Sequence, residues 1–176
     1  MRIAYPYILI LLFGILLSAC ENKFVPPKTD LKSEDIPEQE SWHSSVAFSD
    51  SGKVKAILRA GHIMAFNKKG YTLIDSGAKV DFYRDKAIVS TLTSKRGKVI
   101  EPSKNIEIYD SVVVVNNEGS ILQTQKLFWD NQTQRVSTEE YVKIKTPKEE
   151  VEGIGFISDQ NLKNYTIFKV TGTFAK

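Results

Sequence analysis

The residue types that most often carry catalysis are few in this sequence, and their spacing does not suit a reaction. The two histidines, His43 and His62, have no cysteine or carboxylate at a metal-ligand spacing, so we expect them to be solvated or locally hydrogen-bonded. The sequence contains no Gly-x-Ser-x-Gly elbow, phosphate-binding loop or dinucleotide fingerprint. We therefore expect no catalytic residue, no metal and no cofactor.

The carboxylates form two clusters that a glycoside-cleaving enzyme could in principle use. Glu139 and Glu140 form the first, and Glu149, Glu150 and Glu152 form the second. Such an enzyme needs two acids that face each other across a cleft. Because the neighbours of both clusters are lysines, threonines and turn residues, solvated strand ends explain them without a reaction.

Two further short segments could bind a ligand. Lys95, Arg96 and Lys98 are the densest basic group and could pair with the phosphates of a phosphorylated lipid, although an exposed turn is the favoured interpretation. The Gly153-Ile154-Gly155 segment lacks the third glycine of a nucleotide-binding loop. We expect these glycines to permit a close approach of two backbones or a bend in a strand.

The thiol of Cys20 is the one group for which the sequence predicts a covalent reaction. Arg2 precedes an apolar stretch at residues 7–17, and Leu17-Ser18-Ala19-Cys20 fits the bacterial lipobox. The motif implies cleavage after Ala19 and attachment of a diacylglycerol to Cys20, the single cysteine of the chain. We therefore expect a signal peptide at residues 1–19, a lipid anchor in the membrane and no disulfide.

The rest of the chain divides into a tether and one domain. Residues 20–43 are rich in proline and charge and cannot bury enough apolar surface to offset their ordering entropy. Residues 44–176 then form a single domain. Without Arg2 the chain has 23 lysines and arginines against 21 acidic residues, a balance that gives no case for nucleic-acid binding.

From residue 44 onward the sequence predicts an all-β domain. Runs rich in Val, Ile, Thr, Tyr and Phe alternate with turn residues, with turns expected at 50–52, 68–70, 116–119 and 130–132. In residues 79–84, Val80 and Phe82 alternate with Asp81, which predicts one buried and one wet face. The predicted strands are 45–50, 53–60, 63–67, 71–75, 79–84, 87–94, 98–101, 105–110, 112–116, 121–125, 127–130, 135–137, 142–146, 151–157 and 165–174.

A faint internal repeat accompanies these strands. Leu58-Arg59-Ala60, Leu92-Thr93-Ser94, Leu122-Gln123-Thr124 and Phe156-Ile157-Ser158 share a large apolar residue, any residue and a small one. Their spacing of 30 to 34 residues favours an elongated stack of strands over a globular sandwich, although chance recurrence in a β-rich chain is an alternative.

The order of these features resembles the LptC family, the single-anchored periplasmic component of lipopolysaccharide export, in its lipoprotein form. The resemblance covers residues 44–174. It depends on the glycine turn and strand at 50–60, on LTSKRGKV at 92–99, on LQTQKL at 122–127 with VST at 136–138, and on GIGFISDQNLKNY at 153–165. Ser94 and Thr124 depart from the pattern, because the family usually has alanine there.

The resemblance implies an elongated, partly open antiparallel β-jelly roll with an apolar groove for the acyl chains of lipopolysaccharide. Lipid would arrive from the inner-membrane ABC transporter, LptF and LptG with LptB, and leave to an LptA-like periplasmic bridge. The protein would sit on the periplasmic side, with its anchor in the inner membrane preferred over the outer. The expected groove residues are Leu58, Ala60, Val80, Phe82, Leu92, Ile108, Leu122, Val142, Ile144 and Phe156. The expected partner edge comprises Gly153, Gly155, Tyr165, Ile167, Phe168, Lys169 and Val170.

Two other functions stay open from the sequence. The chain could be a structural lipoprotein that bridges envelope proteins by edge-strand pairing without binding lipid. A carbohydrate-active enzyme on a β-sandwich is the third hypothesis, and it lacks the necessary carboxylate pair. The alternation of apolar residues also does not separate an open groove from a closed core, because both need the same pattern.

Overall fold

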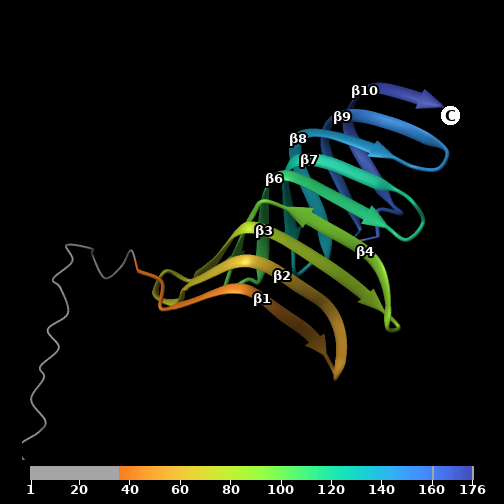
Figure 1. Ribbon diagram of the computed structural model, residues 1–176. Helices are drawn as coiled ribbons and strands as arrows, with labels where there is room; N and C mark the ends of the chain where they lie inside the picture. Colours follow the sequence, from red (N-terminus) through yellow and green to blue (C-terminus); the bar gives the residue numbers. More distant parts are fainter. Residues whose placement is uncertain (1–35, 160, 176) are drawn as a thin grey trace, which may run out of the picture. The chain divides into compact units, whose positions relative to one another are not determined.

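A computed structural model describes residues 36–159 and 161–175, and these residues form one antiparallel sheet (Figure 1). The predicted signal peptide, Cys20 and most of the predicted tether lie outside the described residues. Within them, all the strands are antiparallel to their neighbours, as the sequence predicted for an all-β domain. The elements are β1 (Gln39–Asp50), β2 (Lys53–Phe66), the short 3-10 helix η2 (Asn67–Lys69), β3 (Tyr71–Arg84), β4 (Ala87–Ser94), β5 (Arg96–Ile100), β6 (Asn105–Asn116), β7 (Ile121–Asp130), β8 (Arg135–Lys145), β9 (Glu149–Asp159) and β10 (Tyr165–Ala175).

The strands follow one another in the sheet nearly in chain order, from β1 to β10. One place in this order is shared, because β4 and β5 both pair with β3 on one side and β6 on the other. They are the two halves of a strand that is interrupted at Lys95. Sequential hairpins of this kind need only short connections, which agrees with the turns predicted at 50–52, 68–70, 116–119 and 130–132.

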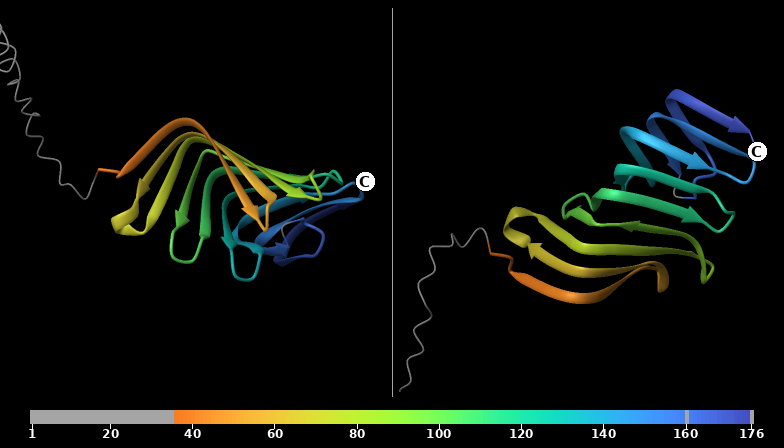
Figure 2. Two further views of the ribbon diagram at one scale, coloured as in Figure 1. Left: turned by 90° about the horizontal axis from the view of Figure 1, so that it is seen from below. Right: turned by 45° about the horizontal axis from the view of Figure 1, so that its top comes forward.

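The long strands bend near their middles, and the bends of neighbouring strands line up across the sheet (Figure 2). Backbone with positive φ marks the bend in β3 at Ser76 and Gly77, in β6 at Asp110 and Ser111, and in β9 at Gly155. Register shifts at the same level interrupt the pairing of β6 with β7, β7 with β8 and β8 with β9. Such bulges add a residue to one strand and turn its direction.

The line of bends divides the sheet into two walls that share one interior. Wall A comprises residues 44–60, 78–94, 112–124, 142–153 and 170–175, and wall B comprises 39–42, 62–75, 97–108, 127–138 and 156–167. The main apolar cluster takes Leu122 and Ile144 from wall A and Leu127 and Phe156 from wall B. The two walls therefore pack on each other, which is the partly open jelly roll that the family resemblance implied.

The bends explain the main differences from the predicted elements. The separately predicted strands 53–60 and 63–67 are both parts of β2, and 105–110 and 112–116 are both parts of β6. Polar and glycine residues at the bends look like turns in the sequence, although the chain continues in the same strand. The first strand also begins at Gln39, before the expected domain boundary at residue 44.

The register corrects one member of the internal repeat. Leu58, Leu92 and Leu122 lie in one row across wall A, joined by Val80 and Val114 on the strands between them. The spacing of the repeat is therefore the length of one hairpin. Phe156 is not in this row, because it lies beyond the bend of β9. The residue of β9 that continues the row is Val151, not Phe156 as the repeat implied.

Candidate functional site

The ten expected groove residues all point into the space between the walls. Eight of them belong to wall A, where cross-strand pairing keeps side chains of one row on one face of the sheet. Ile108 and Phe156 come from wall B and join the same apolar clusters. The sequence thus brings these residues together, and whether they bind lipid is a separate question that we treat as a proposal below.

The interior is closed at one end of the sheet and partly open at the other. In the part formed by β6–β10, the C-terminal half, Leu122, Val142, Ile144 and Phe156 have no solvent-exposed surface. In the part formed by β1–β3, the N-terminal half, Val80 and Phe82 are only half-buried. Val46 and Phe48 of β1, which pair with the inward residues Leu58 and Ala56, are 38% and 48% exposed. The interior therefore combines a closed core with apolar side chains that keep contact with water.

Wall B contributes inward residues that the sequence analysis did not assign to the groove. Near Leu58 and Ala60 these are Ile74 of β3, which belongs to the same cluster, and Ile63 of β2 and Val99 of the neighbouring β5, which pack against it. In the C-terminal half they include Ile106, Leu127, Trp129, Val136, Tyr165 and Ile167. Their alternation in the sequence could have revealed most of them. Leu162 could not have been found in this way, because it is buried although it lies in a loop.

The outer face of wall A contradicts one expectation. Asp81 points away from the interior as predicted, but it is almost fully buried instead of wet. Its carboxylate accepts hydrogen bonds from Arg59 (2.6 Å) and Thr91 (2.8 Å), and Lys79 lies 3.6 Å away. Burial acts to raise the pKa of Asp81, but the hydrogen bonds from Thr91 and Arg59 outweigh it and hold the pKa below its usual value.

The line of bends holds His62 between two carboxylates. Its ring nitrogens lie 2.7 Å from Glu40 of β1 and 3.0 Å from Asp75 of β3, and its ring stacks on Trp42. The hydrogen bond with Glu40 raises the pKa of His62, opposed by partial desolvation and supported by Asp75. Within residues 36–159 and 161–175, no group of three His, Cys, Asp or Glu side chains could hold a metal ion.

The charged groups that could have carried other chemistry have structural partners. Lys143 of β8 forms ion pairs with Glu150 and Glu152 on the neighbouring strand β9. Arg96 pairs with Asp110 at 2.5 Å. These contacts neutralise part of the acidic cluster and of the basic group. The basic group was expected to be an exposed turn, but Arg96 and Lys98 lie in strand β5.

Five of the seven residues of the expected partner edge lie on β10, whereas Gly153 and Gly155 are buried on the neighbouring strand β9. In the described part of the sheet, β10 pairs with β9 alone, and Phe168 and Val170 are 70% and 55% exposed. Tyr165 and Ile167 instead pack against the apolar cluster. Gly153 and Gly155 serve both expected purposes. A side chain at Gly153 would collide with Lys169 and Ile167, and Gly155, with φ of 76°, forms the bend of β9 under Phe168.

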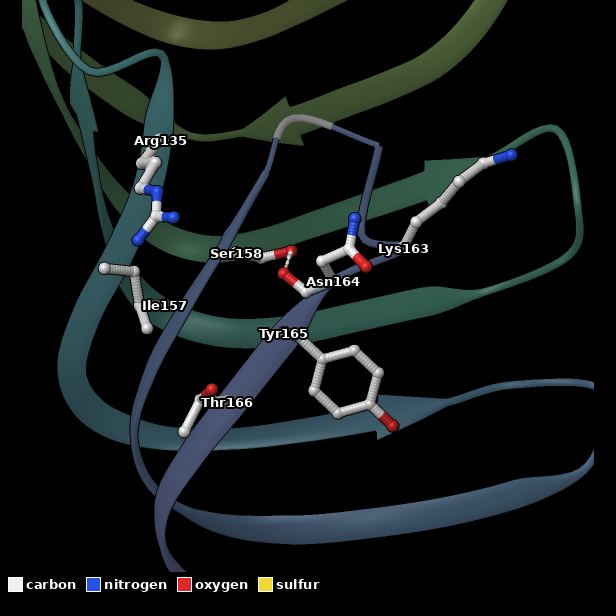
Figure 3. Close-up of a pocket in the computed structure, with 7 residues that line it drawn as sticks. All are labelled: Arg135, Ile157, Ser158, Lys163, Asn164, Tyr165 and Thr166. Carbon is white, nitrogen blue, oxygen red and sulfur yellow. Dashed lines mark hydrogen bonds between the residues drawn. The ribbon is translucent and has the colours of Figure 1, made fainter.

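A hollow of about 420 Å³ lies where wall B ends beside β10 (Figure 3). Ser158, Asn164 and Tyr165 line it together with the cations Arg135 and Lys163. Ser158 donates a hydrogen bond to the carbonyl oxygen of Asn164, so its hydroxyl already has a partner. A second, wider hollow of about 470 Å³ lies at the line of bends, next to His43, Gly61 and Gly77.

These features define a class of protein: a single bent sheet with an apolar interior that is less closed at one end. Within the described residues, the strands at both ends of the order, β1 and β10, pair on one side only. The family model for lipopolysaccharide-assembly, LptC-related proteins matches residues 6–175. The chain belongs to this family, and its role is therefore in lipopolysaccharide transport at the cell envelope. No curated protein matches the chain. Among the described residues, no helix is long and apolar enough to cross a membrane.

Proposed function

We propose that this protein binds lipopolysaccharide by its acyl chains and passes it from the inner-membrane ABC transporter to the next β-jelly roll. The observation that carries the proposal is the half-exposed apolar interior of the N-terminal half, where Val46, Phe48, Val80 and Phe82 face a space that water reaches. Exposed apolar surface of this kind is costly in water, and acyl chains would bury it. LptF and LptG with LptB would supply the lipid, and an LptA-like bridge would receive it.

The test is site-specific photo-crosslinking in cells. A photo-reactive residue at Phe82 should capture lipopolysaccharide, because this side chain points into the open part of the interior. Thr93 is the matched control, since it is exposed and lies on the opposite face of wall A, between the inward Leu92 and Ser94. Asp81 is a poor control because its replacement would break three contacts. Equal capture at Phe82 and Thr93, or none at Phe82, would contradict the proposal.

The exit of lipid would use the free edge of β10. An edge strand exposes unpaired backbone groups that a partner strand can pair with. Proline removes one backbone donor, so of Phe168→Pro and Lys169→Pro we expect one mainly to abolish partner binding and the other mainly to destabilise the fold. Gly155→Arg should weaken the same junction by displacing Phe168. Pull-down of an LptA-like partner and a thermal melt decide this, and normal binding by both proline variants would exclude the mechanism.

The membrane anchor is proposed at Cys20. The lipobox at residues 17–20 supports lipidation, with residues 1–19 as a signal peptide and the segment up to β1 as a tether. Cys20→Ala should leave an unprocessed precursor that incorporates no labelled fatty acid. Unchanged labelling of that variant would show that the chain is not a lipoprotein.

A second candidate function is a structural one, in which the edge strands bind partner proteins and the interior binds no lipid. The two free edges, β1 and β10, favour a bridge between envelope proteins by strand pairing, and the closed interior of the C-terminal half needs no ligand. Purified protein that binds its partners but carries no glycolipid, with no capture at Phe82, would favour this alternative.

A further inference from the structure

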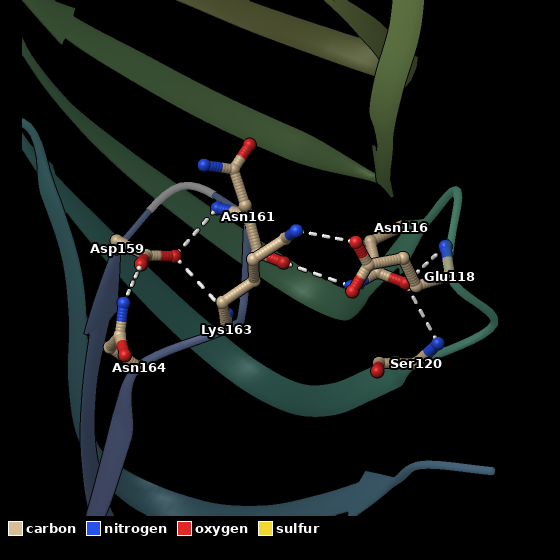
Figure 4. Close-up of polar contacts among 7 residues, drawn as sticks. All are labelled: Asn116, Glu118, Ser120, Asp159, Asn161, Lys163 and Asn164. Atoms are coloured by element: carbon tan, nitrogen blue, oxygen red, sulfur yellow. Dashed lines mark hydrogen bonds and ion pairs between the residues drawn. The ribbon is translucent and has the colours of Figure 1, made fainter.

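Four residues after β9 reach from wall B to wall A. Asn161, Leu162, Lys163 and Asn164, here called the strap, lead into β10 at the end of wall B (Figure 4). The backbone carbonyl of Asn161 accepts a hydrogen bond of 2.9 Å from the side chain of Asn116, at the end of β6 in wall A. Lys163 forms an ion pair with Glu118 in the turn that follows β6. The strap therefore joins the free ends of the two walls.

The strap carries an apolar side chain into the interior. Leu162 is 3% exposed and belongs to the same cluster as the fully buried Leu122, Ile144 and Phe156. Next to it, the ring of Tyr165 stacks on Phe156, and its hydroxyl donates a hydrogen bond to Glu149 of wall A. The closed interior of the C-terminal half thus includes a residue that is not part of the sheet.

Two features of the closed strap are unfavourable. Leu162 has φ of 58°, a left-handed conformation that costs free energy for a residue with a branched side chain. The side-chain oxygen of Asn161 is buried without a hydrogen-bond partner among the described residues, although buried polar atoms normally have one. Opening the strap would relax the backbone at Leu162 and return this oxygen to water.

The contacts that oppose opening are modest. The pair of Lys163 and Glu118 is about half exposed, and exposed ion pairs stabilise little. The Asp159 carboxylate accepts hydrogen bonds from the backbone of Asn161 and Lys163 and from the side chain of Asn164, which shape the strap without tying it to wall A. The main losses on opening are the hydrogen bond from Asn116 to the carbonyl of Asn161 and the burial of Leu162, and another saturated hydrocarbon chain could replace Leu162 there.

We propose that the strap is a displaceable cover and that Leu162 occupies a binding site for an acyl chain in the C-terminal half. This inference rests on the proposed function. A lipid that enters through the open groove of the N-terminal half meets the strap when it advances along the interior. An acyl chain then takes the place of Leu162, the contacts of Asn116 and Glu118 with the strap break, and the interior becomes a groove along its whole length.

The test locks the strap and maps where lipid binds. Glu118→Cys and Lys163→Cys, in a full chain that also carries Cys20→Ser, are joined by a short cleavable thiol linker. The probe is lipid A with a diazirine at the end of one acyl chain, and labelled peptides are identified by mass spectrometry. With the linker cleaved, we expect labels both in the N-terminal half, around Phe82, and in the C-terminal half, around Ile144. With the linker intact, we expect the C-terminal labels to be lost and the N-terminal labels to stay.

The matched comparison is the same protein before and after cleavage, so a folding defect of the variant cannot produce the difference. Equal labelling of the C-terminal half with the linker intact and with the linker cleaved would overturn the proposal that the strap is a displaceable cover. C-terminal labels that are missing in both states, with N-terminal labels present, would also overturn it while leaving the proposed function intact. Absence of labels in both halves would contradict the proposed function itself. Leu162→Gly removes the side chain without backbone strain and should increase C-terminal labelling in the unlinked chain.

Discussion

The two halves of the sheet have the same backbone plan but use their interiors differently. In the C-terminal half, Val142, Ile144 and Phe156 are fully buried and Leu162 covers them. In the N-terminal half, Phe48 and Phe82 face the same interior and keep contact with water. One half therefore has a core that stabilises the fold, and the other has apolar surface that a ligand can cover. The difference shows that one alternating pattern can serve both purposes within a single sheet.

The largest expected effect concerns this contrast in burial. Phe156→Ala should lower the free energy of unfolding by about 3–5 kcal/mol, because it leaves a cavity in a closed core. Phe82→Ala should cost less than about 2 kcal/mol, since water already reaches this side chain. Chemical denaturation of both variants measures the two losses. Similar losses would mean that the N-terminal interior is a closed core in solution. Because water reaches this position, Phe82→Arg should lower the free energy of unfolding by less than the burial of an unpaired charge in a closed core would.

The next effect concerns the packing of β10 on β9. Gly153→Ala should destabilise the chain by about 1–3 kcal/mol, because its Cβ would collide with the backbone of Lys169 and with Ile167. Gly172→Ala is the control on the same strand pair, since its Cβ would come close only to the side chain of Phe174, which is exposed and can move, and would meet Glu152 at an ordinary contact distance of 3.9 Å. Thermal melts compare the two variants. If Gly172→Ala were as destabilising as Gly153→Ala, the close approach at Gly153 would not be the cause.

A smaller effect of pH should come from Asp81 in the N-terminal half. The pKa of Asp81 is lowered in the folded state. The ionised carboxylate therefore stabilises the fold above pH 3.8, its ordinary pKa, and this stabilisation is lost as pH falls through the lowered pKa. The free energy of unfolding should therefore decline below about pH 4 more steeply in the natural chain than in Asp81→Asn. Denaturation between pH 2 and 6 measures this, and parallel curves for the two proteins would contradict it.

The smallest effect concerns the attachment of β1. The pKa of His62 is raised above 6.5 by its hydrogen bonds with Glu40 and Asp75, against partial desolvation. The interactions of His62 therefore stabilise the attachment of β1 fully below pH 6.5, and this stabilisation is lost as pH rises through the raised pKa. Hydrogen exchange of residues 39–43, corrected for the intrinsic rate, should accelerate above that pKa. His62→Gln should remove this dependence on pH, and an unchanged profile in that variant would exclude His62 as its origin.

Much of the sheet could be predicted from the sequence, because alternation and turn residues report on neighbours that are close along the chain. Leu58, Leu92 and Leu122 even recur at the length of one hairpin and lie in one row. The merging of short predicted strands into long bent ones could not be predicted. A bulge at Ser76 and Gly77 has the composition of a turn, and only its pairing with both neighbouring strands shows that β3 continues through it.

The sequence predicted which residues face the interior, but it did not predict how exposed each of them is to solvent. Val80 and Ile144 have equivalent patterns in the sequence, yet one is half-buried and the other fully buried, because exposure depends on which distant segments pack over each half. The burial of Asp81 was missed since it depends on Arg59 and Thr91, which lie on other strands. Leu162 was missed because a left-handed loop residue has no periodic signal.

The row of side chains that crosses wall A has a consequence for any strand that pairs with β10. Side chains of a strand alternate between the two faces of the sheet. To continue the row of Val151 and its paired residue Thr173, the partner strand must place an inward-facing apolar residue opposite Thr173. A shift of one residue would reverse the faces of the partner strand, so that its polar side chains would point toward the apolar interior. The sheet therefore restricts a productive neighbour to every second alignment, a selection that acts through side-chain direction and needs no specific contact.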